Sequence, residues 1–169
     1  ALALIDALNI GDDFDLGGYS LGGRTVARML AKGCRPRRVV ISGMGLEGLT
    51  NTGARAGHFR HVLENLGKHD RGSPAFMAEA FLKTTGGDPI ALLRILDSFV
   101  DTPVEMLRTF DVPIGVICGD ADSDNGSAAE LAELVPQGQL ITVPGNHMSA
   151  VIKPELGLAI RDFLMEEGL

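Results

Sequence analysis

Gly18-Tyr19-Ser20-Leu21-Gly22 is the stretch that decides the fold, because a strand-like segment leads into it and a helix-like segment follows. The pattern Gly-x-Ser-x-Gly is typical of a sharp strand-to-helix turn that holds its serine in a strained conformation and exposes the hydroxyl. Side chains two residues before and after the serine are expected to collide with the backbone. This predicts that Gly18 and Gly22 are both required. Ser20 is therefore the candidate nucleophile.

Strand-like segments alternate with helix-like segments over much of the chain. Stretches rich in β-branched and apolar residues are predicted to form strands: Phe14–Leu16, Val39–Ser42, Ile114–Cys118 and Leu140–Val143. Strands that alternate with helices indicate a parallel sheet with helices on both faces. The predicted fold class is thus α/β, with about four parallel strands and flanking helices.

Residues 45–110 contain no strand-like segment and are predicted to form a helical cap, inserted between the second and third strands. Apolar residues recur there at the i, i+3, i+4, i+7 spacing of amphipathic helices. Ser73-Pro74, Asp88-Pro89 and Thr102-Pro103 each predict an N-cap followed by proline at the first helical position. We therefore expect one domain over residues 1–169 with this insertion.

A serine hydroxyl needs a general base to become a good nucleophile, and the chain has four histidines. His147 follows the last predicted strand, at the same carboxyl edge of the sheet as Ser20, and is predicted to be that base. His58 and His61 lie three residues apart on a predicted cap helix, where surface or packing roles are expected. Two such ligands without a third do not predict a zinc site. His69 lies in a polar stretch and is expected to be exposed.

An imidazole base needs a carboxylate that fixes its tautomer and stabilises its charged form. Asp120, Asp122 and Asp124 follow the third predicted strand, and Glu47 follows the second. The order Ser20, Asp122, His147 along the chain favours Asp122, with the other three carboxylates as alternatives.

Other residues near the turn are predicted to contact a substrate. The N–H of Leu21 opens the helix after Ser20 and is predicted to donate to an oxyanion, with help from the positive end of the helix. Six residues are expected to line an apolar substrate pocket: Tyr19, Met44, Phe59, Met77, Phe81 and Met148. For each of them, plain core packing is the alternative.

Composition limits the classes of partner. The net charge of −7 disfavours binding to nucleic acid or anionic membranes. No apolar run approaches the ~18–20 residues of a membrane span. The two cysteines have no metal-site spacing, and the glycine-rich turn lacks the pattern of a dinucleotide or phosphate loop. We therefore expect no metal, no cofactor, a small-molecule substrate and a cytoplasmic location, and leave a homodimer open.

Three motifs together resemble the α/β-hydrolase superfamily: Gly18–Gly23, Gly119-x-x-Asp122 and Pro144–His147. The likeness is strongest to its capped esterase and carbon–carbon hydrolase group. In that family the acid stands three residues after the glycine that ends its strand, which implies Asp122 rather than Asp120. The resemblance implies a serine hydrolase that acts on a small acyl or ester substrate through an acyl-enzyme. The alternatives are carbon–carbon bond cleavage, peracid formation, or a ligand receptor that keeps the triad.

One part of the family pattern has no counterpart in this sequence. The family's early strands, and the His-Gly-type loop that supplies a second oxyanion donor, are absent. The resemblance therefore implies the C-terminal portion of the fold, with the missing donor upstream of Ala1. Because one oxyanion donor is worth ~10²–10³ in turnover, we expect this chain alone to be nearly inactive.

Overall fold

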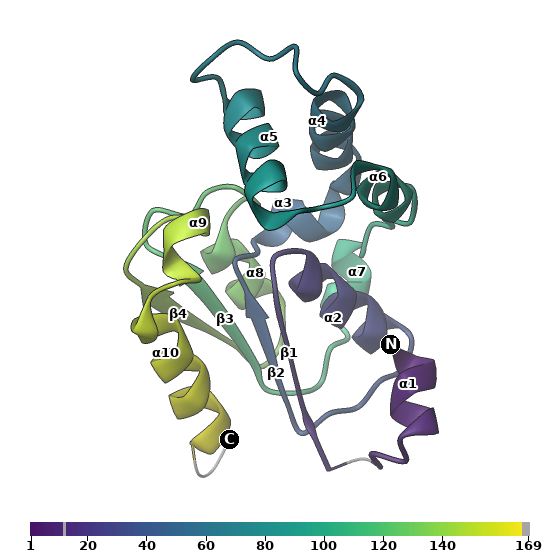
Figure 1. The fold of residues 1–169 in the computed structure, drawn as a ribbon. Coiled ribbons are helices and arrows are strands. Elements are labelled where there is room, and N and C mark those ends of the chain that lie inside the picture. Colours follow the sequence, from purple (N-terminus) through teal and green to yellow (C-terminus); the bar gives the residue numbers. More distant parts are fainter. Residues whose placement is uncertain (12, 167–169) are drawn as a thin grey trace. The chain divides into compact units, whose positions relative to one another are not determined.

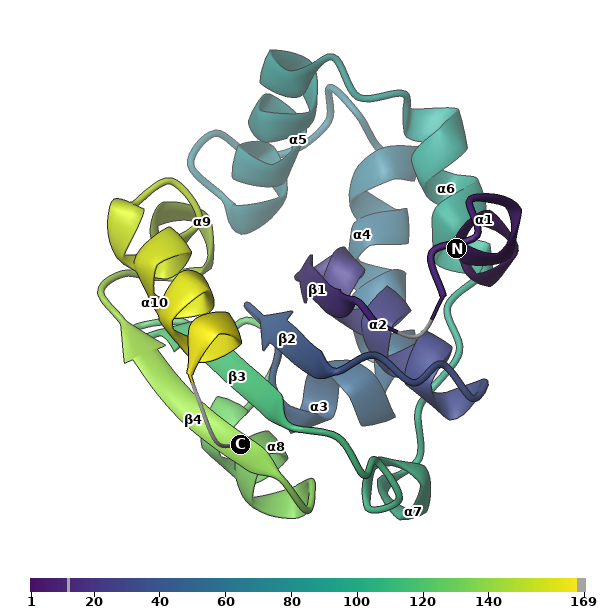
Figure 2. The same ribbon diagram turned by 90° about the horizontal axis from the view of Figure 1, so that it is seen from below.

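A parallel sheet with helices on both of its faces is the main feature of the fold (Figures 1 and 2). The computed structural model describes residues 1–11 and 13–166. The strands of this part of the chain lie in the order β1-β2-β3-β4, and each neighbouring pair is parallel. They are β1 (Asp15–Tyr19), β2 (Arg38–Ser42), β3 (Ile114–Gly119) and β4 (Gly138–Val143). The predicted α/β class with parallel strands is confirmed.

The strand register brings the carboxyl ends of all four strands to one edge of the sheet. Tyr19 of β1 pairs with Ser42 of β2, which pairs in turn with Ile117 of β3. Gly119 of β3 pairs with Val143 of β4. Residues that directly follow each strand therefore meet at the same edge, although the chain separates them widely.

Helices cover both faces of the sheet because residues of the inner strands alternate between two apolar cores. Val39 and Ile41 belong to one core, whereas Val40, between them, belongs to the other. Every residue of β3 is buried. Two helices pack on the first face, α2 (Leu21–Ala31) and α8 (Ala128–Leu134), and two on the second, α9 (His147–Ala150) and α10 (Pro154–Met165). Figure 2 shows these helices around the sheet.

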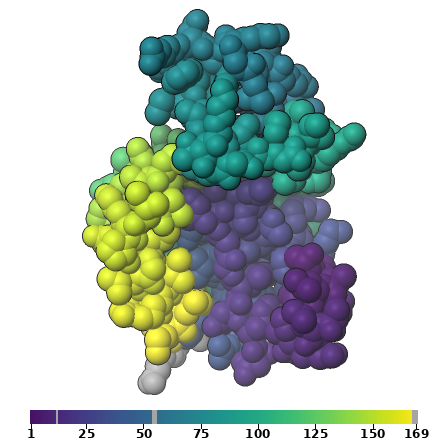
Figure 3. Space-filling model, in the orientation of Figure 1, coloured from purple at the N-terminus to yellow at the C-terminus, as the bar shows by residue number. Residues whose placement is uncertain are grey.

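The chain divides into two compact units. The first comprises Ala1–Thr50 and Thr102–Leu169 and contains the sheet. Its helix α1 (Leu2–Ala7) has no buried residue and lies on the surface, purple in Figure 3. The second, Asn51–Asp101, is narrower than the predicted cap of residues 45–110. The reason is that α3 (Leu46–Thr50) and α7 (Val104–Leu107) pack against α2 in the first unit.

Three helices form the second unit: α4 (Thr52–Glu64), α5 (Pro74–Thr85) and α6 (Pro89–Asp97). The predicted N-caps Ser73 and Asp88 are confirmed, since each side chain accepts hydrogen bonds from backbone N–H groups in the first turn of its helix. The predicted cap at Thr102 is wrong. Pro103 precedes the first residue of α7, and the backbone N–H of Thr102 binds the carbonyl of Leu49 at 2.8 Å instead.

A buried carboxylate joins the α4–α5 connection to α5. The side chain of Glu79 is 5% exposed, accepts a hydrogen bond from the Gly67 N–H at 2.9 Å and pairs with the Lys83 ammonium. The hydrogen bond from Lys83, together with that from Gly67, holds the pKa of Glu79 below its usual value. The side chain of His69 is also buried, and its Nε2–H donates to the Val62 carbonyl at 3.0 Å. The prediction that His69 is exposed is therefore wrong.

Candidate active site

Ser20 occupies the turn between β1 and α2 in a strained conformation. Its φ is +53° and its ψ is −111°, a backbone conformation that residues other than glycine rarely adopt. Strain of this kind costs ~1–3 kcal/mol and persists only where the surrounding structure enforces it. Two backbone hydrogen bonds do so: the Ser20 N–H donates to Ser42 at 2.8 Å, and the Ser20 carbonyl accepts from Arg24 at 3.2 Å. The turn thus has the geometry that its sequence predicts.

The glycines on either side of Ser20 have unequal roles. A Cβ on Gly18 would lie 2.3 Å from the backbone carbon of Gly22, far inside van der Waals contact. A Cβ on Gly22 would meet nothing within 4 Å. The prediction that both glycines are required is therefore wrong for Gly22. The tight approach is made by the strand residue, whereas the position in the first turn of the helix is open.

His147 opens the short helix α9, and its neighbours fix the start of that helix. The Asn146 side chain accepts hydrogen bonds from the N–H groups of Met148 (3.1 Å) and Ser149 (2.9 Å). The Ser149 hydroxyl in turn accepts from the Asn146 N–H at 2.9 Å. This reciprocal capping box defines where the backbone of His147 lies.

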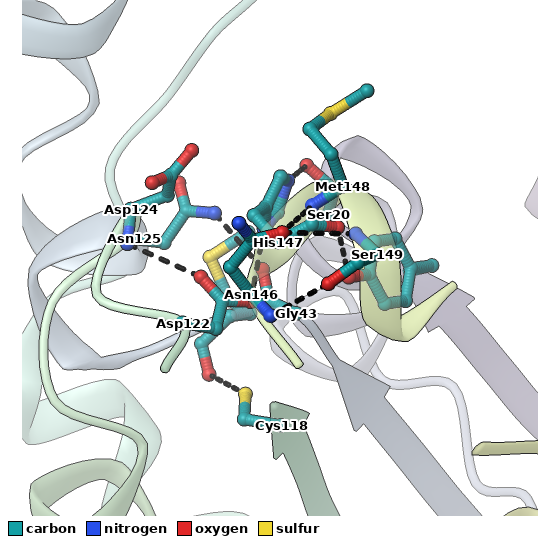
Figure 4. Close-up of polar contacts among 12 residues, drawn as sticks. Ser20, Gly43, Cys118, Asp122, Asp124, Asn125, Asn146, His147, Met148 and Ser149 are labelled. Atoms are coloured by element: carbon teal, nitrogen blue, oxygen red, sulfur yellow. Dashed lines mark hydrogen bonds and ion pairs between the residues drawn. The ribbon is translucent and has the colours of Figure 1, made fainter. Parts of the chain in front are cut away.

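The imidazole of His147 joins Ser20 to Asp122 (Figure 4). His147 Nε2 lies 3.0 Å from Ser20 Oγ, and His147 Nδ1 lies 3.0 Å from Asp122 Oδ2. An ionised carboxylate only accepts hydrogen bonds, so Nδ1 must carry the proton and Nε2 of the neutral ring accepts from the serine hydroxyl. The Asp122 side chain is 2% exposed and the His147 side chain 10% exposed, so the pair is shielded from water.

The other predicted acids have surroundings of their own. Asp120 accepts from the Gly145 N–H at 2.8 Å. The backbone N–H of Asp124 donates to Asp122 Oδ1 at 3.2 Å, which orients the carboxylate. Glu47 is exposed on α3. Of the four predicted carboxylates, Asp122 is the one that lies against His147.

Tyr19, the residue before Ser20, contacts His147. Its hydroxyl donates to the backbone carbonyl of His147 at 2.6 Å, and the two ring centroids lie 5.3 Å apart with a 36° tilt. Burial, followed by the charge of Asp122, raises the pKa of Tyr19 to about 12. The phenol therefore keeps its proton and remains a donor at neutral pH.

Asn125 ties the Asp122 loop to the end of β2. Its side chain is buried, and its Nδ2 donates to the carbonyl of Gly43 at 2.9 Å. Arg24, also buried, contacts the amide oxygen of Asn125 at 3.4 Å. Figure 4 shows Asn125 and Gly43 beside the Asp122 loop. This contact between loops was not predicted from the sequence.

Comparison with solved structures gives the fold a wider context. A hydrolase from Pseudomonas aeruginosa matches with a TM-score of 0.72 and 22% identity, over 98% of this chain and 69% of that one. An enol-lactonase from Burkholderia xenovorans matches with a TM-score of 0.68 and 21% identity, over 98% and 70%. An esterase from Thermogutta terrifontis matches with a TM-score of 0.62 and 21% identity, over 95% and 68%. These are α/β-hydrolase structures. This chain has the α/β-hydrolase fold.

The likeness is one of fold rather than of close sequence. No family model and no curated protein matches the chain. Within the α/β-hydrolase fold, the strained turn at Ser20 and the loops that hold Asp122 and His147 all lie at the carboxyl edge of the sheet. The described residues contain no group of three or more His, Cys, Asp or Glu that could hold a metal ion. None of their helices is long and apolar enough to cross a membrane.

The predicted substrate-lining residues lie in different surroundings. Met44 is 1% exposed and belongs to the apolar core of the first unit, so its predicted place in a pocket is wrong. Met148, next to His147, is 50% exposed. The other apolar candidates lie on the second unit, where Phe59 is half-buried and Met77 and Phe81 are exposed.

Sequence patterns could have revealed part of what was missed. Asn146 followed by Ser149 has the spacing of a capping motif, which is visible without coordinates. The hydrogen bond from Tyr19 to His147 and the one from Asn125 to Gly43 join residues 128 and 82 positions apart. No local pattern encodes such pairs, so these two contacts needed the structure.

Proposed function

We propose that this chain contains the catalytic machinery of a serine hydrolase that cleaves a small acyl or ester substrate through an acyl-enzyme. One observation supports the proposal above all others. The Ser20 hydroxyl lies 3.0 Å from a histidine nitrogen that can accept its proton, while the opposite nitrogen of that ring is held by a buried carboxylate. Nucleophile, base and orienting acid are then Ser20, His147 and Asp122.

The first half of the proposed reaction forms the acyl-enzyme. Ser20 Oγ attacks the substrate carbonyl carbon as its proton passes to His147 Nε2, and the carbonyl oxygen becomes an oxyanion. The imidazolium that results is stabilised by Asp122 at Nδ1. The tetrahedral intermediate then collapses, and His147 returns the proton to the leaving alkoxide or amine.

The second half releases the acid. A water molecule loses a proton to His147 Nε2 and attacks the acyl carbon, and collapse of the second tetrahedral intermediate returns that proton to Ser20 Oγ. The hydroxyl and the neutral ring are thereby regenerated.

Leu21 is the proposed oxyanion donor on this chain. Its N–H begins α2, and the first N–H groups of a helix have no acceptor within that helix. The positive end of the helix adds to the attraction for developing negative charge. Leu21 directly follows Ser20 in the chain, which supports this assignment.

The substrate class rests on the character of the neighbouring side chains and on the proteins of similar fold. Met148 beside the base is apolar and half-exposed. Proteins of similar fold include an esterase and an enol-lactonase. An acyl or ester substrate fits both the apolar neighbour and the proteins of similar fold. In a substrate screen, the competing outcomes are carbon–carbon cleavage, peracid formation and slow-turnover ligand binding.

A fluorophosphonate probe tests the mechanism without knowledge of the substrate. It phosphonylates serines that a neighbouring base activates, so we expect label on Ser20 in the wild-type protein and none in Ser20→Ala. Ser123→Ala, which removes an exposed hydroxyl near the same edge, is the matched control and should label normally. The test uses the full-length protein, which includes any oxyanion donor upstream of Ala1. A folded full-length wild-type protein, checked by circular dichroism, that takes up no label would refute the proposal. Nitrophenyl esters and dienone acids then separate ester from carbon–carbon cleavage.

A further inference from the structure

Tyr19 is the residue in this site whose contacts the proposed reaction does not use. It is the last residue of β1 and immediately precedes Ser20. Its hydroxyl donates to the backbone carbonyl of His147 at 2.6 Å, and its ring lies 5.3 Å from the imidazole. It therefore connects the strand that holds the nucleophile directly to the segment that holds the base.

The end of β2 is shaped to accept the tyrosine ring. Gly43 has a φ of +58°, and a Cβ at this position would lie 2.6 Å from Cζ of Tyr19. Any side chain at Gly43 would thus displace the ring and its hydroxyl. The carbonyl of Gly43 is itself held by the buried amide of Asn125. The ring of Tyr19 therefore has a fixed position against Gly43, and this position directs its hydroxyl toward His147.

We infer that Tyr19 is a positioning residue that holds His147 at the distance from Ser20 needed for proton transfer. The inference rests on the proposed function. His147 is then restrained at three points: its backbone carbonyl by Tyr19, its Nδ1 by Asp122, and its Nε2 by Ser20. Two of these three restraints come from the consecutive residues Tyr19 and Ser20. A movement of the end of β1 would therefore shift the base and the nucleophile together.

This role differs from the predicted substrate contact. The Tyr19 hydroxyl donates its proton to the His147 carbonyl, so it cannot donate the same proton to a ligand. A positioning role changes the rate of chemistry and leaves substrate affinity nearly unaltered, whereas a substrate contact changes affinity. The two roles therefore differ in which kinetic constant moves.

Tyr19→Phe tests the inference because it keeps the ring and removes only the hydroxyl. Loss of one hydrogen bond of this kind predicts a fall of about threefold to tenfold in kcat and in the rate of fluorophosphonate labelling. KM should stay within about twofold, since no substrate contact is lost. Thr25→Val is the matched control, because it removes an exposed hydroxyl that donates to the Leu21 carbonyl in the first turns of α2. It should leave labelling unchanged.

Two results would overturn the positioning role. One is a folded Tyr19→Phe protein that labels at the wild-type rate, and the other is a rise in KM with kcat unchanged. Proton NMR of the Nδ1–H shared by His147 and Asp122 gives a readout that needs no catalysis. Its low-field signal should shift or broaden in Tyr19→Phe and stay unchanged in Thr25→Val. If wild-type protein takes no label, the proposed function fails by itself, and an unaltered NMR signal in Tyr19→Phe refutes the positioning contact separately.

Discussion

The carboxylate of Asp120 accepts a hydrogen bond from the backbone N–H of Gly145 at 2.8 Å, which ties the loop after β3 to the loop after β4. The bond is reciprocated in the backbone, where the Ala121 N–H donates to the Gly145 carbonyl at 3.0 Å. Asp122 lies on the first of these loops, and His147 is the first residue of α9, which follows the second loop. Two aspartates only two residues apart thus do different work: one joins the loops, and the other holds the imidazole.

Asp122→Asn should nearly abolish turnover while the protein stays folded. An amide at this position can donate as well as accept, so it no longer selects the tautomer with Nδ1–H or stabilises the imidazolium. We expect kcat to fall by about 10⁴-fold, as for loss of the orienting carboxylate in a serine triad. Ester hydrolysis or the labelling rate of Ser20 measures the effect.

Asp120→Asn is the control for that substitution. The oxygen of its amide can still accept from the Gly145 N–H, so the tie between the loops remains. Activity should stay within about threefold of wild type, since a single neutral hydrogen bond contributes ~1 kcal/mol or less here. Equal losses in the two variants would show that Asp122 has no special relation to His147.

Gly18→Ala should be strongly destabilising, whereas Gly22→Ala should be tolerated. The added methyl at position 18 would lie 2.3 Å from a backbone atom, and overpacking of this kind costs ~1–3 kcal/mol or more. The methyl at position 22 meets open space, and alanine is favoured over glycine in a helix by ~1 kcal/mol. Thermal melts of both variants measure the difference. A Gly22→Ala protein as unstable as Gly18→Ala would contradict this account of the turn.

The parts of the fold predicted from sequence are those that local patterns determine. Apolar β-branched runs such as Val39–Ser42 favour a buried strand, and the Gly-x-Ser-x-Gly pattern favours the sharp turn at Ser20. Parallel pairing then brings the strand ends to one edge regardless of the length of chain between them. The candidate nucleophile, base and acid could be named because each follows the carboxyl end of a strand by a few residues at most.

The parts that were wrong depend on contacts between distant segments. Met44 was assigned to a pocket because apolar side chains suit both a core and a binding surface, and only burial distinguishes them. His69 was expected to be exposed from its polar neighbours, yet the connection folds back so that its ring reaches the Val62 carbonyl. Tyr19 bonds to a backbone carbonyl that any residue would supply, so no sequence pattern marks the pair.

The ionisation of Tyr19 should be measurable in isolation, because it is the one tyrosine of the chain and there is no tryptophan. Burial disfavours the phenolate, and its pKa rises to about 12 in the folded protein, against ~10 for an exposed tyrosine. An alkaline titration followed by tyrosinate absorbance should therefore show its midpoint near the higher value. A folded protein that titrates near the ordinary value would contradict the buried, donating hydroxyl.

The same shift predicts a loss of stability at high pH. The folded state favours the protonated phenol, so this contribution to the free energy of unfolding is complete below the unfolded pKa of ~10. It is lost as the pH rises from there through the folded value of about 12. Tyr19→Phe, which has no ionisable group at this position, should show a smaller alkaline decline in urea denaturation experiments.

Glu79 should make stability depend on pH at the acid end. Its pKa is lowered in the folded state by the hydrogen bond from Lys83 and by the N–H of Gly67. A carboxylate with a lowered pKa stabilises the fold above the unfolded pKa of ~4.3, and this stabilisation is lost as the pH falls through the folded value. Glu79→Gln keeps an oxygen for Gly67 but has no charge, so its free energy of unfolding should fall less between about pH 6 and pH 3 than that of wild type.

Glu64→Gln on α4 provides the comparison for this prediction. Glu64 lies 4.0 Å from Arg60 in an exposed i,i+4 pair, and such surface pairs contribute little because water and salt screen them. Urea denaturation at the two pH values should therefore give the same acid decline for Glu64→Gln as for wild type. A Glu79→Gln protein whose stability declines in parallel with that of wild type and of Glu64→Gln would show that the charge of the buried carboxylate does not stabilise the fold.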